Sequence, residues 1–531
     1  MNSITRVISV SRFVNHRVLL LATFWLLSAC AASVPSHKPA AFSFTETTID
    51  DIHTAIKSQS TDCEAITTGF LKRIKKYDEI SNLNSIIYLN PDAVEKAKAL
   101  DRKYLATKAM RSLHCVPVIL KDNFDTADMP TEAGSIALSG SIPADDAYMV
   151  RKLRQADAIV IAKSNMGEWA FSPYNTISST HGETRNAYDL SRVPAGSSGG
   201  TASAIAANFG VIGMGSDTGN SIRGPASHLA LVGIRSTIGV TSRDGIVPLL
   251  LNRDIGGPLM RTVKDSAKVF NVIAGYDPAD PVTRGYQNHP VADYAAHLDK
   301  DGLSGIRLGV LRQIYDTDTA DKRVLAVFSQ ALKDLQATGA IIIDPVTIPN
   351  FEDLVKATGF CSRFRYDINN YLKTLGNKTG FKTLKEIVEQ EKFRPENSGA
   401  MKWAMSIGAD VEPAEQNPPC IDVEGDPRRK ALLTAVVKTM DDLDLGALIY
   451  PSWSNPPRKI GDSKSPDGNN SPVIAPHSGQ PAITVPMGYV ANSLPLGLQL
   501  LGRPFSEEKL FQYAYAYEQA TGHRKPPLLF P

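Results

Sequence analysis

One glycine- and serine-rich stretch, residues 194–225, constrains this chain more than any other segment. It reads PAGSSGGTASAIAANFGVIGMGSDTGNSIRGP, and two serine-bearing turns, GSSGG and TGNS, flank a run of small apolar residues. Glycine lets a backbone turn tightly and approach other groups closely. The apolar run predicts a short buried helix over about 201–208 and a buried strand over about 211–215. The helix and strand would then set the distance between the two serine turns.

The composition sets broad limits on the class of protein. A length of 531 residues allows one very large domain or two to three ordinary ones. With 43% hydrophobic and 21% charged residues the chain is an ordinary globular protein. A net charge of +2 gives no reason to expect nucleic acid or an acidic partner.

The N-terminus has the pattern of an exported protein. Residues 1–17 carry three arginines and no acidic residue, and 18–27 form a short apolar run. This predicts a signal peptide over 1–30, too short for a comfortable membrane span. The run Leu27-Ser28-Ala29-Cys30 resembles a bacterial lipobox, so we expect lipidation of Cys30 and a periplasmic protein anchored to the outer membrane. Ordinary cleavage after the A-x-A site ending at Ala31 would instead give a soluble periplasmic or secreted protein.

The rest of the chain is expected to form a tether over 31–46 and a single domain over 47–531. Strand and helix patterns alternate along it, which predicts an α/β fold: a large mixed, mostly parallel sheet covered by helices on both faces. The region of about 351–422 is irregular and rich in aromatic and charged residues, and is interpreted as a mostly helical insertion that walls a pocket. The patterned segments are 116–121, 158–163, 231–234, 265–273, 307–311, 322–338, 340–344, 447–450, 481–486, 496–501 and 506–521.

Four further cysteines follow Cys30, namely Cys63, Cys115, Cys361 and Cys420. They form no C-x-x-C motif or Cys/His cluster, so a structural zinc site is not expected. An oxidising compartment permits disulfides, and Cys361–Cys420 is the favoured pair because both lie in one irregular region. Two or more buried free thiols are the expectation for the set as a whole.

Several residue sets could support a serine nucleophile, which needs a base within reach. Ser198 matches G-x-S-x-G and could use His477 or His523, although residues 191–194 before it do not form a buried strand. The serine–lysine pattern of penicillin-binding proteins is also present, as Ser506-x-x-Lys509 and Lys378-Thr379-Gly380. The order of these two motifs along the chain is wrong for those enzymes, and Ser506 is more simply a helix cap.

Lysine offers a different base. Lys121 directly follows the apolar strand of residues 116–120, where an exposed loop lysine is the ordinary interpretation. To accept a proton near pH 7 its pKa would have to fall by about three units, which burial can achieve. The two serine turns would then supply the nucleophile and a proton carrier.

Several segments together resemble the amidase signature family, over roughly residues 60–525. Ser197 and Ser221 lie 24 positions apart, as the two catalytic serines of that family do. The segments that carry the resemblance are 116–122, 196–200, 215–226, 232–237, 256–262, 479–483 and 495–499.

The resemblance implies a role for each matching residue. Ser221 would be the nucleophile, Lys121 the base, and Ser197, which follows a cis peptide bond in the family, would carry the proton between them. The backbone N–H groups of Thr218, Gly219, Asn220 and Ser221 would form the oxyanion hole. Ser198, Asp217 and Arg223 would have supporting roles, or would only make turn contacts and a local ion pair.

The family's activity implies amide hydrolysis to an acid plus ammonia or an amine, without a metal or cofactor. Small-molecule or peptide amides are the expected substrates, and the aromatic insertion favours an apolar or aromatic acyl group. The alternatives are the glutamine-hydrolysing subunit of a tRNA-dependent amidotransferase, or a non-catalytic lipoprotein that keeps the fold. Two residues depart from the family pattern, because Asn220 and Cys115 stand where glycine is common.

Overall fold

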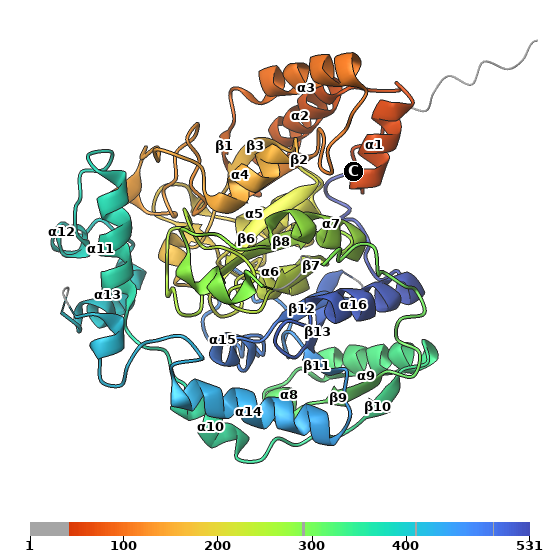
Figure 1. Ribbon diagram of the computed structural model, residues 1–531, viewed down its shortest axis with the longest axis vertical. Helices are drawn as coiled ribbons and strands as arrows, with labels where there is room; N and C mark the ends of the chain where they lie inside the picture. The colour runs from red at the N-terminus through yellow and green to blue at the C-terminus, as the bar shows by residue number, and fades with distance from the viewer. Residues whose placement is uncertain (1–41, 289–291, 409–410, 492) are drawn as a thin grey trace, which may run out of the picture. The chain divides into compact units, whose positions relative to one another are not determined.

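An eleven-stranded sheet runs through the computed structural model (Figure 1), which describes residues 42–288, 292–408, 411–491 and 493–531. The strand order is β1-β3-β2-β6-β8-β7-β12-β13-β11-β9-β10. The strands are β1 Ile86–Leu89, β2 Pro117–Lys121, β3 Ile159–Ser164, β6 Ile212–Asp217, β7 Val232–Arg235, β8 Ile255–Met260, β9 Arg307–Val310, β10 Ile341–Ile343, β11 Ala447–Pro451, β12 Ala482–Val490 and β13 Leu494–Leu501, with a separate pair β4 Ile177–Ser178 and β5 Gly182–Glu183.

The sheet confirms the predicted mixed α/β fold but not the predicted excess of parallel pairs. Among the described strands, β2 pairs in parallel with β3 and β6, and β9 pairs in parallel with β10 and β11. The other six pairings are antiparallel. Two features explain the difference. Strand β8, which the sequence did not reveal, inserts antiparallel between β6 and β7, and the short β12–β13 turn can join only antiparallel strands.

Helices cover both faces of the sheet, as neighbouring glycines of β8 show. A Cβ on Gly257 would meet Ile222 beside α6, whereas one on Gly256 would meet Met149 of α4. Successive residues of a strand point to opposite faces, so α4 and α6 lie on opposite sides. The helices are α1 Ile49–Lys57, α2 Cys63–Ser81, α3 Ala93–Thr107, α4 Tyr148–Gln155, α5 Gly199–Ala206, α6 Arg223–His228, α7 Val263–Ile273, α8 Arg312–Tyr315, α9 Lys322–Ala337, α10 Phe351–Ala357, α11 Phe364–Leu375, α12 Leu384–Glu389, α13 Ser398–Met405, α14 Pro427–Asp442, α15 Ala475–Ser478 and α16 Glu507–Thr521.

The glycine-rich stretch folds into α5, β6 and α6, which hold the two serine turns on one face of the sheet. Every residue of α5 is buried, and Gly213 of β6 faces it. A Cβ on Gly213 would come within 2.6 Å of Ile205 and 2.8 Å of Thr201, so only glycine lets this helix lie so close to the strand. The GSSGG turn therefore precedes α5 and the TGNS turn precedes α6.

The region from 351 to 422 holds α10 to α13, of which α11, α12 and α13 stand together at one side of the sheet in Figure 1. It shares a second hydrophobic cluster with residues 133–170, and that cluster includes Phe364, Leu372 and Trp169. The Phe364 ring packs 4.9 Å from Phe171 and 5.9 Å from Trp169, centroid to centroid. Burying a side chain such as Phe364 contributes about 1.5–3 kcal/mol, so this cluster attaches the insertion firmly to residues 166–171.

The described chain begins inside the predicted tether, and the predicted signal peptide with Cys30 lies outside the described residues. Phe44 packs edge-on against Phe70 of α2, and Glu46 pairs with Arg524 at 2.8 Å. The folded domain thus begins before residue 47. None of the described helices has the length and apolar character needed to cross a membrane.

Two disulfides are present. Cys361–Cys420 is the pair that the sequence favoured, with Cα atoms 5.6 Å apart. Cys63 and Cys115 also pair, with Cα atoms 5.2 Å apart, so the expectation of free thiols was wrong. Cys115 has φ +63°, a left-handed conformation that explains why glycine is common at its position. Its pairing with Cys63 at the start of α2 is a tertiary contact that sequence spacing does not reveal.

Candidate active site

Lys121 is the last residue of β2, and its side chain is completely buried. Its Nζ lies 2.7 Å from Oγ of Ser197, 2.9 Å from Oγ of Ser216 and 3.5 Å from the Ser216 carbonyl oxygen. A neutral amine has two N–H groups and one lone pair. Donating both hydrogens to Ser216 would leave the lone pair directed at the Ser197 hydroxyl.

The surroundings of Lys121 favour this neutral form. Burial lowers the pKa of Lys121 from 10.5 to about 7, against the opposing pull of the carboxylates of Asp217 and Asp254. The sequence interpretation required a shift of this size, and burial supplies it. Lys121 can therefore exchange protons near neutral pH.

Ser197 is held by a tightly packed turn. The Gly196–Ser197 peptide bond is cis, and the Ser197 carbonyl oxygen accepts a hydrogen bond of 3.0 Å from the Gly167 N–H. A Cβ at position 196 would lie 2.2 Å from the Asn175 carbonyl oxygen and 2.6 Å from that of Ser172. Backbone atoms on both sides therefore require glycine before Ser197.

Ser216 and Asn123 are polar partners of this site that the sequence interpretation did not assign. Oγ of Ser216 accepts hydrogen bonds of 2.9 Å from both Lys121 and Asn123. Ser198 donates to the Ser216 carbonyl oxygen at 3.2 Å and so has a structural contact. Ser216 stands in the same turn-and-strand run as Ser221, and Asn123 is two residues after Lys121, so proximity in the sequence was the available clue.

The turn from Thr218 to Ser221 connects β6 to α6 and presents free backbone donors. None of its four N–H groups donates to another residue in the described part of the chain. The Thr218 hydroxyl donates to Asp254, which also accepts the N–H groups of Leu249 and Leu250 at 2.8 and 2.9 Å. Free donors in a fixed turn can stabilise an oxyanion.

Asp217 fixes the base of this turn. Its buried carboxylate lies 3.1 Å from Arg223 and 3.1 Å from Arg235, and it accepts the Ile222 N–H at 3.2 Å. Burial alone would raise the pKa of Asp217, but the two guanidinium groups lower it to about 2. Arg223 also donates to the Gly219 carbonyl oxygen at 2.6 Å, so its ion pair holds the turn in shape.

Asn220 connects the two serine turns. Its Nδ2 lies 3.4 Å from the Gly196 carbonyl oxygen and 3.3 Å from that of Pro173. Asn220 and Gly196 directly precede the two serines, so this contact joins the turn that carries Ser221 to the turn that carries Ser197. The departure from glycine at position 220 thus adds a contact within the site.

A cavity of about 370 Å³ opens at the TGNS turn, and Ser221 lies in its lining. Aromatic side chains from three separate segments face it: Phe171 and Tyr174, Phe360, and Trp403 of α13. Three of these are among the large hydrophobic residues that remain exposed, with exposed fractions of 38% for Tyr174, 49% for Phe360 and 39% for Trp403. Exposed apolar side chains that gather in a cleft indicate a binding site.

The alternative histidine bases lie elsewhere. His477 is buried with Nδ1 2.7 Å from the Thr358 carbonyl oxygen, and burial lowers its pKa to about 3. His523 pairs with Asp334 at 3.2 Å. Neither contacts Ser198. Among the described residues, the grouping that could ligate a metal is Cys63, His114 and Cys115, whose two sulfurs are joined in a disulfide.

Comparison with known proteins agrees with this geometry. The family model described as Amidase matches residues 65–511. The chain belongs to the amidase family. A probable amidase of Arabidopsis thaliana is 32% identical over 529 residues, covering 97% of this chain and 98% of the relative.

Other amidase-family members are similarly related. A glutamyl-tRNA(Gln) amidotransferase subunit of Microcystis aeruginosa is 32% identical, covering 91% of this chain and 99% of the relative. The structure of a peptide amidase from Stenotrophomonas maltophilia is 33% identical with a TM-score of 0.82, covering 92% of this chain and all of that one. The likeness to solved amidases confirms the fold, and this chain is an amidase.

Proposed function

We propose that this amidase hydrolyses a carboxamide to the acid and ammonia through an acyl-enzyme on Ser221, with Ser197 as proton carrier and Lys121 as base. The observation that carries the proposal is the buried contact of 2.7 Å between Lys121 Nζ and Ser197 Oγ. It lies beside a turn whose N–H groups are free, as an acyl-transfer site requires.

In the first half of the reaction, Ser221 Oγ attacks the amide carbonyl carbon. Its proton passes to Ser197 Oγ, and the Ser197 proton passes to the neutral Nζ of Lys121. The carbonyl oxygen becomes negatively charged, and the N–H groups of residues 218–221 stabilise that charge. The pKa of about 7 lets Lys121 accept the proton near neutral pH.

In the second half, the tetrahedral intermediate collapses. The C–N bond breaks, and the proton returns from Lys121 through Ser197 to the leaving nitrogen, which departs as ammonia. Water then attacks the ester of Ser221 and gives up a proton by the same route. The acid is released, and Ser221 regains its hydroxyl.

For the substrate we propose the carboxamide of a peptide or N-acylated amino acid. The likeness to a peptide amidase and the aromatic lining of the cavity support this class. Glutamine hydrolysis for a tRNA-dependent amidotransferase is the alternative within the family, and similar identities leave it open.

Ammonia release from a substrate panel tests these choices. We expect turnover of N-acetyl-phenylalaninamide by residues 42–531, little turnover of glutamine, and loss of activity in Ser221→Ala. Preference for glutamine would favour the amidotransferase alternative. Absence of turnover across aliphatic, aryl and peptide amides would contradict enzymatic function.

We further propose that the protein is exported and anchored through lipidated Cys30. Two disulfides support an oxidising compartment, because such bonds are rare in the cytosol. Labelling cells with a radioactive fatty acid should mark the wild-type protein and not Cys30→Ala. Equal labelling of both would contradict the anchor, and secretion of an unlabelled wild type would support simple cleavage.

A further inference from the structure

Phe360 forms the wall of the cavity that faces the oxyanion turn. Its Cζ lies 4.0 Å from the position of a Cβ built on Gly219, so the ring lies directly over that turn. Yet 49% of Phe360 is exposed, and the apolar interior does not hold it in place. The ring packs edge-on against His477 with centroids 5.2 Å apart, and contacts of the residues on either side of Phe360 hold it further.

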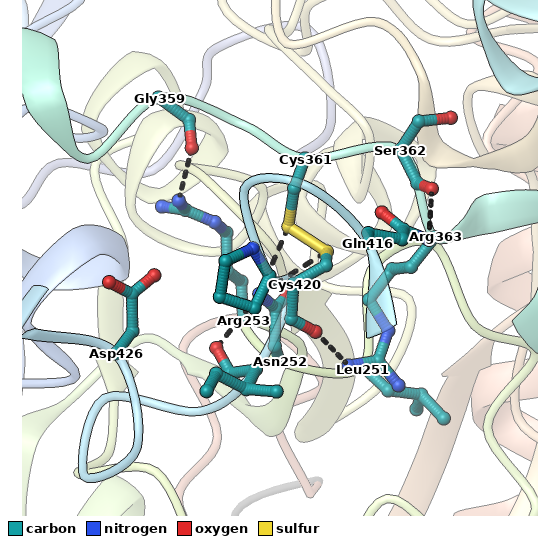
Figure 2. Close-up of a disulfide and its surroundings, with 12 residues drawn as sticks. Leu251, Asn252, Arg253, Gly359, Cys361, Ser362, Arg363, Gln416, Cys420 and Asp426 are labelled. Carbon is teal, nitrogen blue, oxygen red and sulfur yellow. Dashed lines mark hydrogen bonds between the residues drawn. A yellow bond between two sulfur atoms is a disulfide. The ribbon is translucent and has the colours of Figure 1, made fainter. Parts of the chain in front are cut away.

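Arg253 fixes the residues before Phe360. Its guanidinium donates to the carbonyl oxygens of Thr358 at 2.7 Å and Gly359 at 3.0 Å. The guanidinium carbon also lies 4.5 Å from the centre of the Phe360 ring, a cation–π contact. Figure 2 shows this guanidinium directed at Gly359.

The Cys361–Cys420 disulfide fixes the residue after Phe360 (Figure 2). The side-chain amide of Asn252 lies 3.4 Å from the sulfur of Cys361, 3.8 Å from that of Cys420 and 3.3 Å from the Ile421 carbonyl oxygen. The disulfide and the Asn252 amide therefore hold Cys361, the residue after Phe360, beside residue 252.

The same segment reaches the oxyanion turn. Asp254 accepts the Thr218 hydroxyl and the N–H groups of Leu249 and Leu250, and both leucines line the cavity. The disulfide also closes the base of the insertion that carries Trp403, because α11, α12 and α13 lie between its two cysteines. One covalent link thus joins the segment that carries Phe360 to the end of the insertion that carries Trp403.

We propose that Phe360, positioned by the Cys361–Cys420 disulfide and Arg253, is a specificity-determining residue that selects amides with an aromatic or large apolar acyl side chain. The inference rests on the proposed function of the same site. The ring of such a substrate packs against Phe360 while its carbonyl oxygen meets the turn beneath. An amide with a small acyl side chain makes no contact with the Phe360 ring, so its reaction depends only on contacts with the serine turns.

The test compares N-acetyl-phenylalaninamide with N-acetyl-alaninamide. Phe360→Ala should lower kcat/KM for the aromatic amide about 10- to 100-fold, and that for the alanine amide less than about threefold. The double variant Cys361→Ser/Cys420→Ser should move the selectivity ratio in the same direction. The matched control is Cys63→Ser/Cys115→Ser, which removes the other disulfide and should leave the ratio unchanged.

Two results would overturn the proposal: an unchanged ratio in Phe360→Ala, or equal losses of selectivity in the two disulfide variants. If the Cys361→Ser/Cys420→Ser chain does not fold, Phe360→Ala and Phe360→Leu decide, with partial recovery of the ratio expected in the second. Calorimetry of the binding of both amides to Ser221→Ala, and to the same variant with Phe360→Ala added, measures binding selectivity in the absence of turnover. Absence of turnover in the wild type with selective binding in Ser221→Ala would contradict the proposed function and support this inference.

Discussion

The two serine turns with Lys121 and the wall around Phe360 border the same cavity but are built in opposite ways. The serine turns are buried and held by hydrogen bonds and ion pairs among neighbouring residues, such as Asp217 with Arg223. The wall is half exposed, and a disulfide and one arginine hold it from far along the chain. On the proposed function, the turns would perform the chemistry and the wall would select the substrate.

The largest effect is expected from removing the base. Lys121→Ala should lower kcat about 10³- to 10⁴-fold, because no other side chain contacts Ser197 to accept its proton in the described part of the chain. His477→Ala should leave kcat within about threefold, since His477 lies at Thr358. Steady-state kinetics of both purified variants checks this. Loss of activity in His477→Ala alone would show that a histidine, and not Lys121, is the base.

The next largest effect is expected on the free energy of unfolding, which should fall by different amounts for a buried and a partly exposed ion pair. Asp217→Asn leaves two buried guanidinium groups without their counter-charge and should cost about 3–5 kcal/mol. Asp467→Asn, in the cavity lining, removes the charge from the partly exposed pair with Arg458 but keeps an oxygen that can accept the Asn469 N–H, and should cost less than about 1 kcal/mol. Chemical unfolding followed by circular dichroism measures both. Similar losses would contradict the contrast between the two regions.

Ser216→Ala should produce a smaller effect, confined to the chemistry. Losing a hydrogen bond to the Lys121 amine is expected to lower kcat about 10- to 100-fold, with KM for an aromatic amide little changed. Ser216→Thr keeps the hydroxyl and serves as the control. If Ser216→Ala altered substrate selectivity instead of kcat, the division between chemistry and selection would fail.

The smallest effect is the pH dependence around neutrality. Since neutral Lys121 is the reactive form, kcat/KM should rise with pH, reach half its maximum near pH 7 and level off by about pH 9. The folded lysine also binds fewer protons than the unfolded one between pH 7 and 10.5, so wild-type stability should rise with pH relative to Lys121→Met. A rate that falls with pH through 7 would contradict the assignment of Lys121 as base.

The serine turns could be predicted from the sequence because the motif is nearly contiguous and several of its glycines have a steric cause. Gly196 and Gly213 lie so close to other atoms that a side chain would clash, so the glycines in the sequence mark positions of close packing. Lys121 was assigned as the base only from the family resemblance, because a lysine at the end of a strand is ordinarily an exposed loop residue. Its approach to Ser197 required the parallel pairing of β2 with β6.

For the wall, the sequence predicted a pocket-forming insertion over about 351–422 and the Cys361–Cys420 pair, but not the contacts that hold Phe360 in place. Asn252 and Cys420 are 168 positions apart, and nothing in their local sequence indicates that they meet. The pairing of Cys63 with Cys115 was missed for the same reason. Strand β8 was missed because its Gly-Gly-Pro run has low strand propensity, and its place between β6 and β7 comes from tertiary packing.

The most direct test of the central claim is to identify the serine that becomes acylated. The enzyme is mixed with the p-nitrophenyl ester of N-acetyl-phenylalanine, quenched in acid and digested, and its peptides are analysed by mass spectrometry. We predict that the N-acetyl-phenylalanyl group is found on Ser221 and is absent from the Ser221→Ala variant. Its appearance on Ser198 or Ser197 would contradict this account.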